Sequence, residues 1–132
     1  HAAGLDGLRP GHGYVVQRLI NGPATVGDIA AALAVSQQAV SKSVRELVAL
    51  GYAEQREDPA DRRRRPVRLT RRGLRAVDVA RRTRADLATT VAARVGAVDV
   101  SAALRVARAT AEVLGTGDRV RRRAVAPPLD RS

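Results

Sequence analysis

The sequence predicts a mainly α-helical fold with one small β-hairpin, and three observations lead to this prediction. Apolar residues recur at helical spacing along most of the chain. Two short strand-like segments, 52–57 and 65–70, flank a polar loop in the middle of the chain. Two longer helical patterns follow, at about 71–96 and about 100–114. The chain has 132 residues, which is the usual size of one domain.

The first helix is expected from His12 to Ile20, with Tyr14, Val15 and Leu19 turned inward. The sequence Asn-Gly-Pro at 21–23 should end it, because glycine and proline both interrupt helices. His12 could face a pocket, but a single histidine near a helix start is expected at the surface.

A second short helix follows a capping box. Thr25 stands three residues before Asp28, so each can bond the backbone N–H of the other at the start of the helix. Thr25 could also hold a phosphate through its backbone N–H, as helix N-termini do, but its capping role is enough to explain it.

The clearest helix covers about residues 36–50, where Ser36 is a good N-cap and Gly51 a good terminator. Its expected buried face consists of Val40, Val44, Leu47 and Val48, which recur at spacings of three and four. The opposite face is polar and carries Gln37, Gln38, Ser41, Lys42 and Arg45. Taken alone, this polar face is best interpreted as an ordinary solvated helix surface.

The loop between the two strands concentrates positive charge. It contains Arg62, Arg63, Arg64 and Arg65 in a row, directly after Asp61. Residues 54–75 carry nine basic and four acidic residues, whereas residues 1–53 carry four and three, and the whole chain has a formal net charge of +11. An arginine run alone is more often a solvated loop, but clustered charge at a hairpin tip favours a polyanionic partner.

Two helices joined by a short turn and followed by a basic hairpin describe a winged helix-turn-helix domain, here residues 1–70. Helix 36–50 would be the recognition helix and 53–70 the wing. The major groove of B-DNA admits one helix, so Gln37, Gln38, Ser41 and Lys42 are candidates to contact base edges. Arg45 would contact a phosphate or pair with an acidic neighbour. The wing arginines would reach phosphates or the minor groove.

The C-terminal part should provide helices for dimerisation, over residues 71–116. Both long helices carry apolar seams, and nothing else in the chain is available to cover them, so the seams are expected to face each other and a second copy. Arg84 interrupts the first seam. It either pairs with an acidic residue of a neighbour, which we favour, or lines a pocket. The basic, proline-containing tail, 117–132, is expected to be disordered.

Several classes of function are disfavoured by composition. The chain has no cysteine, no histidine pair and no glycine-rich loop between a strand and a helix. We therefore expect no enzyme activity, no metal site and no cofactor. No apolar run is long enough to span a bilayer and no signal-peptide pattern is present, so we expect no membrane association and a cytoplasmic location.

The stretch from about Thr25 to Gly73 resembles the MarR family of bacterial transcriptional regulators. The resemblance is carried by Ser41-Lys42, Leu50-Gly51, Asp58-Pro59, Asp61-Arg62-Arg63 and Leu69-Thr70 with Gly73. It implies a homodimer that binds a pseudo-palindromic DNA operator, usually as a repressor, and that a small aromatic or phenolic effector releases. It also implies that Asp61 orients a wing arginine and that Arg63 enters the minor groove. The chain departs from the family pattern in having few residues before Leu8 and few aromatic residues near the expected pocket.

Two alternatives to a sequence-specific regulator remain open. Winged helices also dock proteins, so the chain could be a protein-interaction module. It could also bind nucleic acids by charge alone, without sequence preference. An interaction module would not need Gln37, Gln38 and Lys42 on its outward face.

Overall fold

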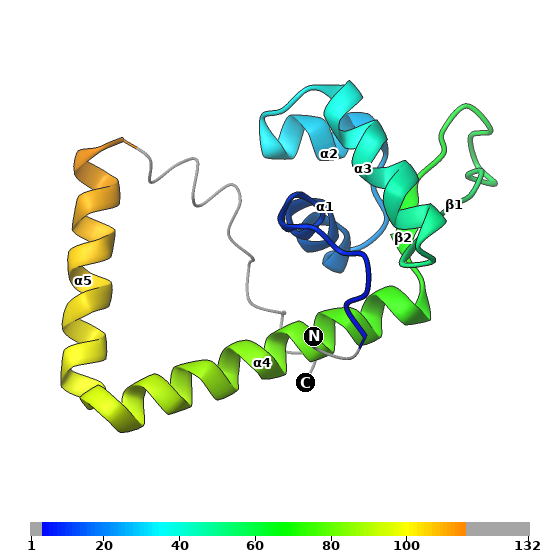
Figure 1. Ribbon diagram of the computed structural model, residues 1–132. Coiled ribbons are helices and arrows are strands. Elements are labelled where there is room, and N and C mark those ends of the chain that lie inside the picture. Colours follow the sequence, from blue (N-terminus) through cyan, green and yellow to red (C-terminus); the bar gives the residue numbers. More distant parts are fainter. Residues whose placement is uncertain (1–3, 116–132) are drawn as a thin grey trace.

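The computed structural model describes residues 4–115, which form five helices and a two-stranded antiparallel sheet (Figure 1). The prediction of a mainly α-helical chain with one small hairpin is confirmed. The elements are α1 (Pro10–Ile20), α2 (Val26–Leu33), α3 (Gln37–Ala49), β1 (Ala53–Gln55), β2 (Val67–Leu69), α4 (Arg71–Val95) and α5 (Ala97–Val113). The tail expected to be disordered, 117–132, lies outside the described residues.

Capping residues, proline and glycine explain where the three short helices begin and end. Pro10 starts α1, since its fixed φ suits the first helical position. Thr25 caps α2 with the expected capping box, and Ser36 caps α3. Gly51 follows α3 with a φ of 77°, a left-handed conformation that glycine adopts without strain. The turn between α2 and α3 is tight because Ala34 takes the same left-handed region.

The hairpin is shorter than the sequence indicated. Each strand has three residues, and Ala53, Glu54 and Gln55 pair with Leu69, Arg68 and Val67 respectively. Ala24 adds an antiparallel bridge to Val67, which ties the chain before α2 to the second strand. The hairpin is therefore anchored at its base, and the residues between the strands are left to form the wing loop.

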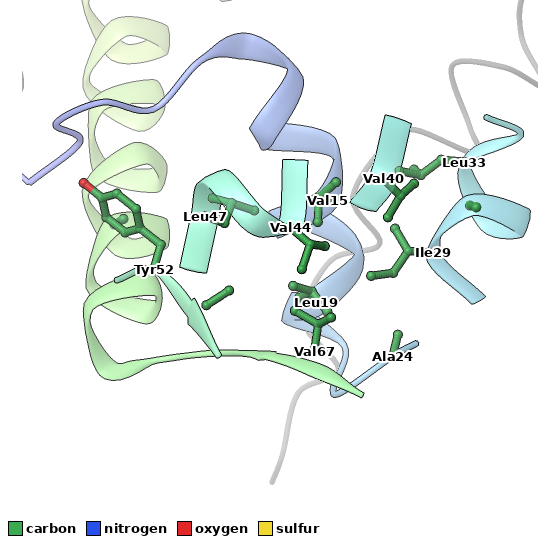
Figure 2. Close-up of a cluster of buried hydrophobic side chains, with 13 residues drawn as sticks. Val15, Leu19, Ala24, Ile29, Leu33, Val40, Val44, Leu47, Tyr52 and Val67 are labelled. Atoms are coloured by element: carbon green, nitrogen blue, oxygen red, sulfur yellow. The ribbon is translucent and has the colours of Figure 1, made fainter. Parts of the chain in front are cut away.

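The core lies where α1, α2 and α3 meet the base of the hairpin. Figure 2 shows side chains from all of these elements pointing toward one another. The most completely buried large side chains are Tyr52, Ile29, Leu47, Val40 and Val67. The predicted stripe on α3 is confirmed for Val40, Val44 and Leu47, but Val48 is 41% exposed because it lies beyond the edge of this face. Tyr14 is also not inward and is 44% exposed, since Val15 and Leu19 occupy the buried side of α1.

The start of α4 is packed tightly against the chain that leaves α3. A Cβ atom at Gly73 would lie 2.1 Å from the carbonyl oxygen of Tyr52, so only glycine fits at this point of the helix. Thr70 caps α4 by accepting a hydrogen bond from Gly73 N and donates its own hydroxyl to Gly51 O at 2.6 Å. The first turn of α4 is consequently fixed to the segment that follows α3.

Most of α4 and all of α5 extend away from this domain (Figure 1). The two helices are joined at Gly96 and bent by 114°, so α5 turns by more than a right angle from the direction of α4. The expectation that their seams face each other is wrong within one chain: no residue of α5 is buried, and Val98 and Leu104 are 82% and 51% exposed. Within residues 4–115 no single helix could cross a membrane by length and apolarity, although α4 and α5 taken together across their bend reach that threshold.

Candidate nucleic-acid interface

Helix α3 presents a polar face at its N-terminal end. Ser36 Oγ accepts a hydrogen bond from Ala39 N at 3.2 Å, which fixes the first turn. The face beyond it carries the exposed residues Gln37, Gln38, Lys42 and Arg45, with Ser41 partly buried. Because Val40, Val44 and Leu47 turn the opposite side of α3 into the core, these polar side chains point outward.

The start of α2 lies beside the start of α3. Thr25 Oγ1 accepts from Asp28 N at 3.1 Å, and Thr25 N donates to Asp28 Oδ2 at 3.3 Å. The hydrogen bond from Thr25 lowers the pKa of the Asp28 carboxyl, and the charge of Arg64 lowers it further. A Cβ at Gly27 would lie 3.7 Å from Gln37 Nε2. The expected cap at Thr25 therefore adjoins the polar end of the recognition helix.

The wing loop is shaped by two aspartates. Asp58 Oδ1 accepts from Ala60 N at 2.9 Å, and Asp61 Oδ1 accepts from Arg63 N at 3.0 Å. Asp61 thus bonds the backbone of Arg63, one of the wing arginines. These local bonds are typical of Asp residues in turns, where the side chain imitates a backbone acceptor.

The four arginines of the wing differ in their surroundings. Arg64 forms an ion pair with Asp28 at 3.5 Å, and Arg65 pairs with Glu57 at 2.8 Å. Arg62 and Arg63 are exposed, and neither has an ion pair within the part of the chain that the structure describes. The first two arginines of the run are therefore the cations available to an external anion.

The Arg64–Asp28 pair also joins the separate parts of the surface. It links the wing to the first turn of α2, where a Cβ built on Gly27 would lie 3.7 Å from Gln37 Nε2 of α3. Thr25, Gln37 and Arg64 are thereby brought together, while Gln38, Lys42 and Arg45 follow along α3. Arg62 and Arg63 belong to the loop between β1 and β2, which Figure 1 shows extending from the hairpin.

The base of the wing is held by a cluster of charges on the two strands. Glu54 accepts from Arg68 Nε at 2.7 Å and from Arg56 at 3.1 Å. The hydrogen bond from Arg68 is the main reason why the pKa of the Glu54 carboxyl lies below its usual range, and the bond from Arg56 lowers it further. Exposed pairs of this kind add little stability each, but they restrict the directions of the strand side chains.

A cavity of about 310 Å³ lies between α1 and the first half of α4, and its walls come from segments far apart in the sequence. Its walls are mainly apolar, and its polar lining residues include His12, Gln17, Arg81 and Arg84. Arg84 is exposed and lines this cavity. The described residues of this single chain contain no ion pair to Arg84, so the pairing with an acidic residue that we favoured is not seen here.

The surroundings of His12 were not revealed by the sequence. The expectation of a surface histidine is wrong: His12 is 3% exposed and its Nε2 lies 2.6 Å from Glu46 Oε2. Glu46 belongs to the recognition helix, 34 residues along the chain. Neither residue stands in a motif, so only the packing of α1 against α3 could have found the pair.

Comparison with known proteins agrees with this geometry. A family model described as MarR family matches residues 6–64, which contain α1 to α3 and most of the wing. No curated protein is significantly similar to the chain in sequence.

Three solved structures illustrate the similarity. The transcriptional regulator Tm0710 from Thermotoga maritima is 25% identical, with 83% of this chain and 78% of that chain covered and a TM-score of 0.62. The MarR family transcription regulator SP03579 is 22% identical, with 83% and 74% covered and a TM-score of 0.71. A mutant of S. aureus MepR bound to an oligodeoxyribonucleotide is 19% identical, with 86% of both chains covered and a TM-score of 0.64. These similarities show that the chain has the winged helix-turn-helix fold of such regulators, and that its residues 6–64 match the model of the MarR family.

Proposed function

We propose that the protein is a sequence-specific DNA-binding transcriptional repressor that acts as a homodimer on a pseudo-palindromic operator and responds to a small-molecule effector. The observation that carries the DNA-binding part is the surface formed by α3 and the wing. It combines outward-facing glutamines with Lys42, Arg62 and Arg63, which are exposed and form no ion pair in the described residues.

This surface suits a DNA duplex for two reasons. Glutamine side chains at the first turns of a helix can bond base edges in the major groove, with Gln to adenine as a favoured bidentate pair. Arginines on a flanking hairpin can reach phosphates or the narrow, negative minor groove. Among the solved structures with this fold, the S. aureus MepR mutant is bound to an oligodeoxyribonucleotide, which supports the proposal.

The homodimer is supported by the apolar surface of the two C-terminal helices. Leu87, Val91, Val95 and Leu104 are exposed although they recur on helical seams, and no residue of α5 is buried in the described chain. Contiguous apolar surface of this kind is typical of an interaction site. A second copy would bury it and would also place two recognition helices on one duplex, as an operator with two half-sites requires.

The effector response is supported by the cavity between α1 and α4. Its volume of about 310 Å³ lies at the lower end of the range for small-molecule sites. Apolar walls, Tyr52 and the guanidinium groups of Arg81 and Arg84 suit a small aromatic acid or phenol. The cavity adjoins both the DNA-binding helices and the arm proposed to form the dimer, so an occupant would contact both.

The decisive experiment selects bound sequences from a random pool of duplex DNA. A two-fold symmetric motif, with half-site centres about one helical turn apart, would support the homodimer and the operator together. Enrichment of no motif, with scrambled DNA competing as well as any other, would leave only charge-driven binding. Small aromatic acids and phenols are then screened for loss of the selected complex.

Three variants connect the selected DNA to this surface. Changing Gln37, Gln38 and Lys42 together to alanine should abolish specific binding, whereas a protein-interaction module would keep its activity. Arg63→Ala should weaken operator binding by about 1–3 kcal/mol, the usual loss for one good groove contact. Arg82→Ala is the matched control, since Arg82 is an equally exposed arginine on α4. Equal effects of Arg63→Ala and Arg82→Ala at matched salt would refute the role of the wing.

A further inference from the structure

His12 belongs both to the cavity wall and to the support of the recognition helix. It lines the cavity from α1, and its Nε2 contacts Glu46 Oε2 on α3 at 2.6 Å. Glu46 does not line the cavity but stands one helical turn after Lys42. The imidazole thus touches the cavity on one side and a carboxylate of the DNA-facing helix on the other, and it is the buried member of this contact, since Arg9, which also lines the cavity and lies 3.7 Å from Glu46, has an exposed side chain.

The hydrogen bonds of His12 define its state. Its Nδ1 accepts from Arg9 N at 3.1 Å, so this nitrogen carries no proton. The proton of the neutral ring is therefore on Nε2, where it is donated to Glu46. This hydrogen bond is the main reason why the pKa of the Glu46 carboxyl is lowered. The positive charge of Arg9, 3.7 Å away, lowers it further. Both ring nitrogens are satisfied, and the ring has one favoured orientation.

One buried polar atom in the wall of this cavity has no hydrogen-bond partner in the described residues. Gln17 lies on α1 and also lines the cavity, and its Oε1 is buried without a hydrogen-bond partner in the described residues. Buried polar atoms usually have partners, so Gln17 Oε1 offers an acceptor to an occupant. An occupant that filled the space between α4 and α1 would press on the same helix face that carries His12.

We propose that the His12–Glu46 pair is a positioning pair that transmits the filling of the cavity to the recognition helix. This inference deepens the effector response proposed above and rests on it for its biological role. An occupant displaces the imidazole, the Nε2–H bond to Glu46 lengthens, and α3 loses its buried hydrogen bond to His12 of α1. Since α3 is one continuous helix, the change reaches Gln38 and Lys42 within two turns.

The pair can be tested without knowing the effector, because the cavity can be filled from its own wall. Ala80 of α4 lines the cavity, so Ala80→Leu adds apolar atoms to it, and Ala80→Val is a smaller version should the first variant not fold. Ala85→Leu is the matched control, since Ala85 is exposed on the same helix and does not line the cavity. The bond is broken by Glu46→Ala, whereas Glu46→Gln removes the charge but keeps an acceptor for Nε2–H.

Two readouts decide the proposal. Imidazole nitrogen resonances report on His12, which is readily assigned because the chain has two histidines and His12→Gln removes its signal. Backbone amide resonances of residues 37–42 report on α3. We expect Ala80→Leu to shift both sets of signals in the parent and in Glu46→Gln. In Glu46→Ala the shifts of 37–42 should disappear, and Ala85→Leu should cause none.

DNA affinity provides the functional readout. On the selected operator, Ala80→Leu should weaken binding about fivefold or more, the lower end of typical coupling between two sites. The loss should persist in Glu46→Gln and vanish in Glu46→Ala. If Ala80→Leu shifts residues 37–42 equally in Glu46→Ala, or shifts nothing in the parent, the positioning role is wrong. If the parent binds no DNA at all, the proposed function fails, and the resonances still decide whether the pair couples cavity and helix.

Discussion

Gly73→Ala would add one methyl group where α4 passes closest to the chain that leaves the recognition helix. A Cβ there would lie 2.1 Å from the Tyr52 carbonyl oxygen and 3.3 Å from Leu69 Cβ. The carbonyl cannot retreat freely, because it accepts a hydrogen bond from Thr70 N at 3.0 Å. The methyl group must therefore push α4 away from the hairpin or break this bond.

The size of the effect follows from three contributions. Forcing a methyl group into packed structure costs about 1–3 kcal/mol. Weakening the Thr70–Tyr52 hydrogen bond costs about 0.5–1.5 kcal/mol. Alanine is favoured over glycine within a helix by about 1 kcal/mol, which offsets part of this. The net loss of unfolding free energy should be about 1–3 kcal/mol, or roughly 4 °C in Tm for each kcal/mol in a domain of this size.

Gly13→Ala is the matched control. Gly13 is within α1, and a Cβ there would meet no atom within 4 Å, so this variant should gain up to about 1 kcal/mol. Urea unfolding followed by circular dichroism, at equal protein concentration because association affects apparent stability, measures both variants. A Gly73→Ala protein that is as stable as the parent would show that the close approach to Tyr52 does not determine how α4 is placed.

Three further predictions concern other parts of the molecule. Tyr52→Phe removes the hydroxyl that donates to Asp6 O at 2.9 Å, and urea unfolding should show a loss of about 0.5–1.5 kcal/mol. The pKa of the Glu46 carboxyl is lower in the folded protein than its ordinary value. The stabilisation that this carboxylate provides is therefore present above about pH 4.3 and is lost as the pH falls through the folded pKa. Unfolding midpoints of Glu46→Gln should consequently decline less on acidification than those of the parent. Leu104→Glu places a charge on the exposed face of α5, and sedimentation should show a shift from dimer to monomer with unchanged helix content if that face joins two copies.

Much of the DNA-binding region could be predicted because its signals are local. The caps at Thr25 and Ser36 depend on residues within one turn, and both are found in the structure. The buried stripe of α3 follows from helical periodicity. The positions of the strands also followed from the pattern, although their ends did not, because hydrogen bonding stops after three residues on each side.

The features that could not be predicted depend on contacts between distant segments. The burial of His12 requires Glu46, and nothing in the sequence near either residue indicates the other. The ion pairs of the arginine run could not be predicted either, because Arg64 pairs with Asp28 on α2 and not with a residue of the wing. The direction of α5 depends on the backbone at Gly96, which periodicity does not specify.

The close fit of Gly73 against Tyr52 makes α4 a lever with its pivot beside the recognition helix. At 25 residues, the helix is about 37 Å long. A tilt of about 5° at the pivot would move the far end by about 3 Å, since displacement grows in proportion to the length of the rod. A change in the angle of α4 that is too small to disturb the core would thus cause a large displacement at Gly96. Conversely, a large displacement of apolar side chains near the far end of α4 would change the position of α3 only slightly.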